Sequence, residues 1–148
     1  MTPKEKNDLL FVCTLIEFIA RTTHNHVKDV VTFMGYDELS RQLKYADVNH
    51  CLTMEENFAD ILTRRQIPKG DFDSVGNAHD FVPSKTAIGG VYRRLITNLF
   101  TPNDDVIDTL IKVYNSFISE KISNFNGATF YQNQSYIYHS YLEGKLLD

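Results

Sequence analysis

The sequence predicts an all-α protein, and three observations lead to this prediction. Apolar residues recur at helical spacing in most segments of the chain. Serine, threonine and aspartate stand where they would cap those segments. Hydrophobic residues make up 43% and charged residues 23%, a balance typical of a folded domain. We expect one domain over residues 1–148, a compact bundle of six or seven helices, with sub-regions 1–65 and 84–148 joined by a long loop.

The first predicted helix begins near Pro3 and Lys4 and continues through a long apolar run. Its apolar residues follow the i, i+3, i+4 rule and also cover a second face, which is typical of a central helix packed from two sides. Glu17 and Arg21 are spaced to pair on its remaining polar strip.

Three shorter helices are predicted after a polar break in this pattern. Gly35 is expected to end the first of them in the left-handed conformation, and Asp37 to cap the second. Thr53 and Glu56 match the capping box T-x-x-E, which predicts the start of the third.

The second half of the chain predicts further helices. Ser84 is expected to cap a helix that contains Gly89 and Gly90, and a glycine pair inside a helix favours close approach to another helix. Thr101 is the expected N-cap of one long helix that continues to Ile122.

The C-terminal segment at residues 129–143 fits two structures. Its apolar spacing favours a helix, which we expect. Tyr136, Tyr138 and the turn-like stretch QNQS also fit a hairpin.

Charge and cysteine content limit the functional class. The net charge is −4 and the basic residues are scattered, which argues against a nucleic-acid partner. The longest apolar run is too short for a membrane span, and Glu17 interrupts it, so no membrane partner is expected. Cys13 and Cys51 do not make a disulfide framework, and a cytoplasmic location is the simplest interpretation.

Residues 66–83 lack helical periodicity and carry prolines, glycines and aspartates, which predicts a long loop. Asp73, His79 and Asp80 of this loop, with Arg93, can be combined into the acid–base site of a small hydrolase or transferase. The alternative is that they form turns and solvated charges.

Two other reactive-looking stretches favour a structural interpretation. His24 and His26 lie at a helix start without further ligands, so no metal site is expected. His50 and Cys51 are adjacent, and adjacent side chains diverge, so we interpret them as the end of one helix. No cofactor is expected.

Candidate binding residues lie on two surfaces. Glu55 and Glu56 would make an acidic surface able to meet a basic partner. Tyrosine is enriched at interfaces. The candidate tyrosines are Tyr131, Tyr136, Tyr138 and Tyr141.

The first 62 residues or so resemble a bacterial family of small helical proteins of unknown function. The residues that carry the resemblance are Ile16–Glu17, Val30 to Phe33, Tyr45 to His50 and Glu55 to Ile61. Members of that family are often encoded beside toxin-like proteins, so the resemblance implies an antitoxin-like or accessory binding role.

Two functions are therefore predicted, in order of preference. The first is a non-catalytic protein that binds another protein, with a basic, toxin-like protein as the candidate partner and a homodimer also compatible. The alternative is the small hydrolase or transferase that uses His79 and Asp80.

Overall fold

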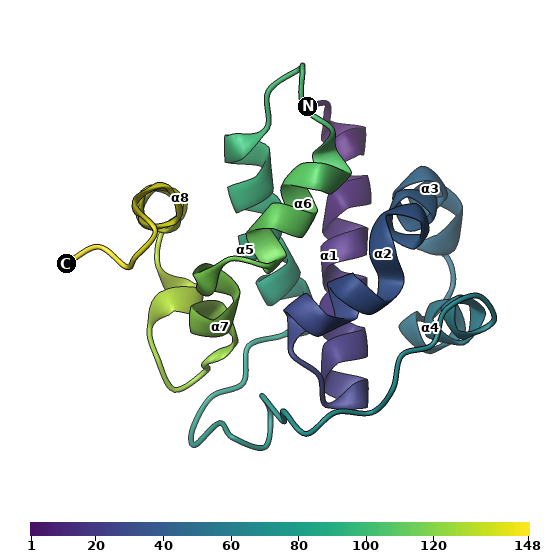
Figure 1. The fold of residues 1–148 in the computed structure, drawn as a ribbon, viewed down its shortest axis with the longest axis horizontal. Helices are drawn as coiled ribbons and strands as arrows, with labels where there is room; N and C mark the ends of the chain where they lie inside the picture. The colour runs from purple at the N-terminus through teal and green to yellow at the C-terminus, as the bar shows by residue number, and fades with distance from the viewer.

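The protein is all-helical, as predicted (Figure 1). The computed structural model describes residues 1–148 and contains eight α-helices, one 3-10 helix and no strand. In chain order these are α1 (Pro3–Thr23), α2 (Val27–Lys44), α3 (Ala46–Asn49), α4 (Met54–Leu62), α5 (Lys85–Leu99), α6 (Val106–Tyr114), α7 (Phe117–Ser123), the 3-10 helix η1 (Thr129–Tyr131) and α8 (Gln134–Glu143). None of these helices is long and apolar enough to span a lipid bilayer.

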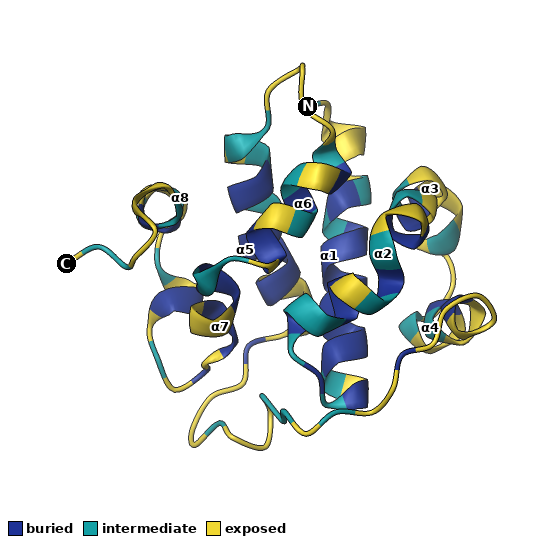
Figure 2. Cartoon of the chain, viewed as in Figure 1, coloured by how far each residue is buried: buried dark blue, intermediate teal, exposed yellow.

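Helix α1 is the central element. Every residue from Phe11 to Ala20 is buried, and α1 lies between α2 on one side and α5 on the other (Figures 1 and 2). The helix begins where the Thr2 hydroxyl accepts a hydrogen bond from the backbone N–H of Glu5. The apolar pattern on two faces of this segment is therefore explained by packing from two sides.

The contact between α1 and α5 depends on Gly89. A Cβ atom at this position would lie 2.5 Å from Thr14 Oγ1 and 2.9 Å from the Thr14 backbone nitrogen. Only glycine fits such a close approach, as the glycine pair predicted. The backbones of α1 and α5 therefore approach each other closely at this point.

Two predicted helix caps and the helix expected in the C-terminal segment are confirmed. Thr53 and Glu56 form both hydrogen bonds of a capping box at the start of α4. The Ser84 hydroxyl accepts from the N–H of Ala87 and caps α5. Asn133 caps α8 in the same way, so the C-terminal segment is a helix and the hairpin alternative is wrong.

Two other boundaries differ from the prediction. The helix expected to begin at Thr101 begins at Val106 instead, because the Asp105 carboxylate accepts from the N–H groups of Ile107 and Asp108. This helix also does not continue to Ile122.

The chain breaks after α6, and the Ser116 hydroxyl caps the next helix, α7. At Gly35 the backbone has φ 73° and ψ 171°, so the expected positive φ occurs, but it kinks α2 where a helix end was expected. The break between α6 and α7 was not predicted, because the apolar spacing continues across it without interruption.

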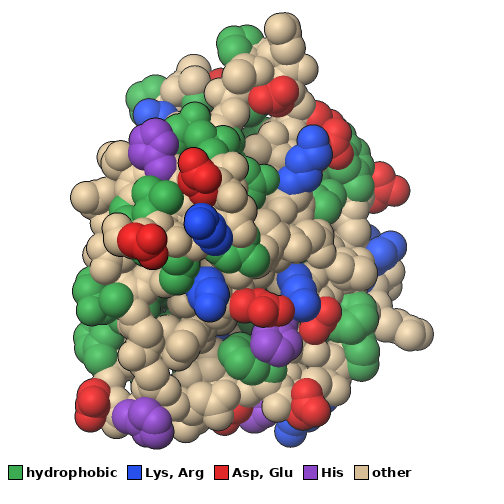
Figure 3. All heavy atoms as spheres, turned by 60° about the vertical axis from the view of Figure 1, so that its left-hand side comes forward, with side chains coloured by type: hydrophobic (Ala, Val, Ile, Leu, Met, Phe, Trp, Pro, Cys, Tyr) green, Lys and Arg blue, Asp and Glu red, His purple; other side chains and the backbone are tan.

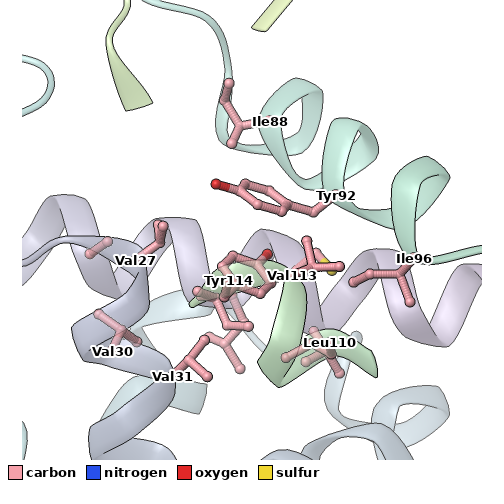
Figure 4. Packing of buried hydrophobic residues seen from close by; sticks show 14 of the residues in the cluster. Val27, Val30, Val31, Ile88, Tyr92, Ile96, Leu110, Val113 and Tyr114 are labelled. Carbon is pink, nitrogen blue, oxygen red and sulfur yellow. The ribbon is translucent and has the colours of Figure 1, made fainter. Parts of the chain in front are cut away.

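The core is one cluster of 31 buried hydrophobic residues drawn from helices on both sides of the long loop. At its centre the rings of Tyr92 on α5 and Tyr114 on α6 stack with centroids 4.1 Å apart (Figure 4). Both hydroxyl groups are buried and have no hydrogen-bond partner. Burial raises the pKa of both phenols well above the ordinary value.

The long loop between α4 and α5 is held by hydrogen bonds. The side chain of Asn126 accepts from the N–H of His79 at 2.9 Å and donates to the carbonyl of Asn77 at 2.8 Å. At the end of the loop, the Arg21 guanidinium donates to the Pro83 carbonyl at 2.8 Å. These bonds place the last part of the loop between α1 and the segment that precedes η1.

Candidate interaction groove

An open groove lies where the end of the loop, the first turns of α5 and η1 meet. Its volume is about 820 Å³, and both aromatic and arginine side chains line it. We call it the aromatic–arginine groove and define it by Phe81, Val82, Arg93, Arg94, Phe130 and Tyr131. These residues come from three segments that are distant in the sequence.

The aromatic wall exposes two large rings. Phe81 is 62% exposed and Tyr131 is 67% exposed, whereas Phe130 between them is 8% exposed. The Phe81 ring stacks on Phe130 with centroids 6.1 Å apart, and the Tyr131 ring meets it edge-on at 5.1 Å. Phe130 therefore ties two exposed rings to the core without burying them.

The α5 wall of the groove carries two consecutive arginines. Arg93 and Arg94 are half-buried, and neither forms a salt bridge or a hydrogen bond within the chain. By contrast, Arg21 and Arg64 are each paired with a carboxylate. Burial, and then the neighbouring charge of Arg93, lower the pKa of Arg94. The wall thus holds two positive charges that no group of this chain neutralises.

Small residues leave space between the walls. Ala87 and Gly90 lie along the α5 side of the groove. A Cβ atom on Gly90 would lie 3.2 Å from Arg94 Nη1 and 3.9 Å from Arg94 Cζ. The Arg94 guanidinium is the only group it would contact. The Arg94 head group therefore lies across Gly90, at the surface of the helix. On the side of the molecule where α8 lies, hydrophobic side chains gather in several places, with Lys and Arg side chains between them (Figure 3).

The four residues of the predicted acid–base site occupy three places. His79 and Asp80 are exposed and line an open hollow of about 520 Å³ that shares Phe81, Phe130 and Tyr131 with the groove. Arg93 lines the groove itself. Asp73 lines neither space, and its carboxylate accepts from the N–H of Gly76 at 2.8 Å, which closes a turn. The structure therefore brings His79 and Asp80 together and leaves Asp73 apart.

The predicted acidic surface is confined to the start of α4. Glu55 and Glu56 are both exposed in its first turn, where negative charge is favourable to the helix dipole. The Glu56 carboxylate also accepts from the N–H of Thr53 at 3.2 Å, so it has a structural role. Helix α4 and helix α5 lie on opposite sides of α1 (Figure 1), so this surface is separate from the groove.

The four candidate tyrosines do not form one exposed surface. Tyr131 lines the groove, whereas Tyr136, Tyr138 and Tyr141 are half-buried and pack from α8 against the core. The Tyr136 hydroxyl donates to the Leu147 carbonyl at 3.0 Å. Tyr131 is therefore the tyrosine of this set that is most available to a partner.

A second groove, of about 640 Å³, lies between α1 and α3 and is lined by Lys4, Asp8, Asp47 and His50 among others. His50 follows the last residue of α3, as predicted, and its Nδ1 lies 3.1 Å from the Ala46 carbonyl. The Sγ atom of Cys51 lies 3.8 Å from His50 Nε2, so these two side chains meet where they were expected to diverge, and Cys51 is exposed. No three His, Cys, Asp or Glu side chains anywhere in the chain are close enough together to hold a metal ion.

Sequence reasoning singled out Tyr131 and Arg93 but missed Phe81, Val82 and Phe130 of the groove. One signal was present: Phe81 and Val82 are large apolar residues at the polar end of a long loop, directly before a proline. Large apolar residues in such a segment are either buried or available to a partner.

No protein-family model, no curated protein and no solved structure matches this chain. The resemblance of the first 62 residues to a toxin-associated helical family therefore stays a prediction. The geometry of the groove is the basis for the functional proposal.

Proposed function

We propose that this protein acts by binding another protein at the aromatic–arginine groove. The observation that carries the proposal is the pair of exposed rings, Phe81 and Tyr131, at 62% and 67% exposure. Phe130 holds both rings in place, so a partner would lose little side-chain entropy in binding them. Rigid aromatic side chains beside arginine are the composition typical of the residues that dominate binding energy at interfaces.

Binding is favoured over catalysis by the placement of the reactive residues. His79 and Asp80 lie in an open hollow, and Asp73 does not lie with them. General acid–base catalysis needs an acid or a base, and a group that positions it, within hydrogen-bond reach of one substrate. The hydrolase or transferase alternative would gain support from a substrate that contacts His79 and Asp80 together.

The antitoxin-like role, the basic partner and the cytoplasmic location are narrower proposals. The first of these depends on the family resemblance. The basic partner depends on the exposed carboxylates of Glu55 and Glu56 on α4. The groove carries positive charge through Arg93 and Arg94, so the same partner is not expected to occupy both surfaces.

Affinity purification of the tagged full-length protein from its own cells tests the proposal. Phe81→Ala/Tyr131→Ala removes both exposed rings of the groove. The matched control is Val48→Ala/Leu142→Ala, which shortens two apolar side chains that are 63% and 57% exposed elsewhere on the surface. We expect a stoichiometric co-purifying protein with the wild type and with the control, and about a tenfold lower yield with the groove variant, as for the loss of about 1.4 kcal/mol.

Both variants are first compared with the wild type by circular dichroism. Exposed side chains contribute little to stability, so all three proteins should unfold at similar temperatures. Two results would contradict the proposal: equal recovery of the partner with the groove variant, or equal loss of the partner with the control.

A further inference from the structure

We infer that the groove binds an extended peptide segment in which an acidic residue stands next to a large apolar one. This inference rests on the proposed function and names the chemistry of the partner. It combines two features of the same groove, the uncompensated arginine pair and the exposed rings of Phe81 and Tyr131. Each feature selects a different part of the ligand.

The arginine pair selects a carboxylate. Arg93 and Arg94 are adjacent in the sequence and line one groove, and neither has an acceptor within the chain. Two neighbouring positive charges repel each other, and a carboxylate close to either of them reduces that repulsion. The planar guanidinium group also matches a carboxylate with two parallel hydrogen bonds. The Asp or Glu side chain of a partner supplies this group.

The aromatic wall selects an apolar neighbour of that carboxylate. The rings of Phe81 and Tyr131 both contact Phe130, are exposed and line the groove. Burying them against an aliphatic or aromatic side chain removes apolar surface from water. Since both walls belong to one open groove of about 820 Å³, the acidic and the apolar side chain of the ligand must be close in its sequence.

A single-stranded nucleic acid is the competing ligand, because arginine and aromatic rings also bind phosphates and bases. The net charge of the protein is −4, and Asp80 lines the adjoining hollow. A phosphate backbone carries a charge at every nucleotide and would meet this repulsion along its length. A peptide with one or two carboxylates places its charge at the arginines alone, so we favour the peptide.

Selection of peptides from a random displayed library on the immobilised full-length protein tests this inference. The charge-reversed variant is Arg93→Glu/Arg94→Glu. Its matched control is Lys69→Glu/Lys145→Glu, which changes the net charge equally at two exposed lysines without a partner in the chain. We expect the wild type and the control to enrich peptides with Asp or Glu beside an aliphatic or aromatic residue. The charge-reversed variant should lose this preference.

The strongest peptide is then measured by fluorescence anisotropy. We expect an affinity loss of about 100-fold on charge reversal, which is about tenfold for each arginine. Arg93→Lys/Arg94→Lys keeps the charge but not the bidentate geometry, and should lose less. A labelled single-stranded oligonucleotide is the parallel probe.

The outcomes separate this inference from the proposed function. If the peptide is lost with Phe81→Ala/Tyr131→Ala but not with charge reversal, the groove binds proteins and the acidic preference is wrong. If neither pair of changes reduces binding, or if the wild type selects no peptide, this inference fails, and the co-purification experiment decides the proposed function separately. Tighter binding of the oligonucleotide than of the peptide would also overturn this inference.

Discussion

Replacing Gly89 with alanine tests the closest contact in the fold. A Cβ atom added to Gly89 would lie 2.5 Å from Thr14 Oγ1, 2.9 Å from the Thr14 nitrogen and 3.1 Å from its Cα. The Oγ1 atom cannot simply rotate away, because it donates a 2.7 Å hydrogen bond to the Leu10 carbonyl. Two of the three clashes involve backbone, so α1 and α5 must separate.

The size of the effect follows from these distances. Non-bonded carbon atoms prefer a separation of about 3.5 to 4.0 Å, so the helices must move apart by roughly 0.5 to 1 Å. Overpacking of this kind destabilises a core by about 1 to 3 kcal/mol, and contact with backbone places Gly89→Ala at about 3 kcal/mol. Alanine regains about 1 kcal/mol through its higher helix propensity. The expected net loss is about 2 kcal/mol, or about 4 to 8 °C in Tm for a chain of this length.

Gly90→Ala is the matched control. It lies one residue further along α5, and its added Cβ would contact only the Arg94 guanidinium, the mobile end of a long side chain. It should therefore be neutral or stabilising by up to about 1 kcal/mol. The assay is urea unfolding followed by circular dichroism at the helical band. A Gly89→Ala variant as stable as Gly90→Ala would refute the close approach of α1 and α5.

Three further changes test ionised groups. Burial raises the pKa of Glu17, so its contribution to stability is largest below the unfolded-state pKa of about 4.3 and is lost as pH rises. The wild type should therefore lose stability relative to Glu17→Gln between pH 4 and 7 when unfolding is measured as a function of pH. A constant difference between the two proteins would contradict this. The hydrogen bond from Tyr36 lowers the pKa of Asp105, the N-cap of α6, so Asp105→Ala should lose about 1 kcal/mol at pH 7. That difference should shrink as pH falls below about 3.9, and an unchanged gap would refute it. The Arg64 guanidinium donates to both oxygens of buried Glu38, at 2.8 and 3.1 Å. Arg64→Ala should therefore lower the free energy of unfolding by about 2 kcal/mol in chemical unfolding. The stability of Arg64→Lys should lie between those of the wild type and Arg64→Ala.

Local sequence signals predicted the helices well where a cap or a periodic face was involved. The caps at Thr53 and Ser84 depend on neighbours a few residues away, and both are confirmed. The close approach at Gly89 depends on the absence of a side chain, and it is confirmed as well. The break between α6 and α7 was missed for a physical reason. Apolar residues continue on both sides of Ser116, because both helices face the same core, and periodicity alone does not show that the axis changes direction.

The candidate groove was only partly predictable. Tyr131 stood out as an aromatic residue and Arg93 as part of a basic run. Nothing in the sequence places them in one groove with Phe81, since that proximity depends on how the loop crosses the end of α1. The Asn126 bonds to the loop and the Arg21 bond to its last residues arise only when the helices have packed.

The sequence by itself determined the helical class, the starts of α1, α4 and α5 and the two-sided burial of α1, because these depend on side-chain spacing and on hydrogen bonds within a few residues. Only the tertiary structure decided which exposed side chains share a surface. Long-range packing joins Phe81, Phe130 and Arg94 from separate segments into one groove. Contacts between distant segments depend on the closure of the whole chain, and no local pattern encodes that closure.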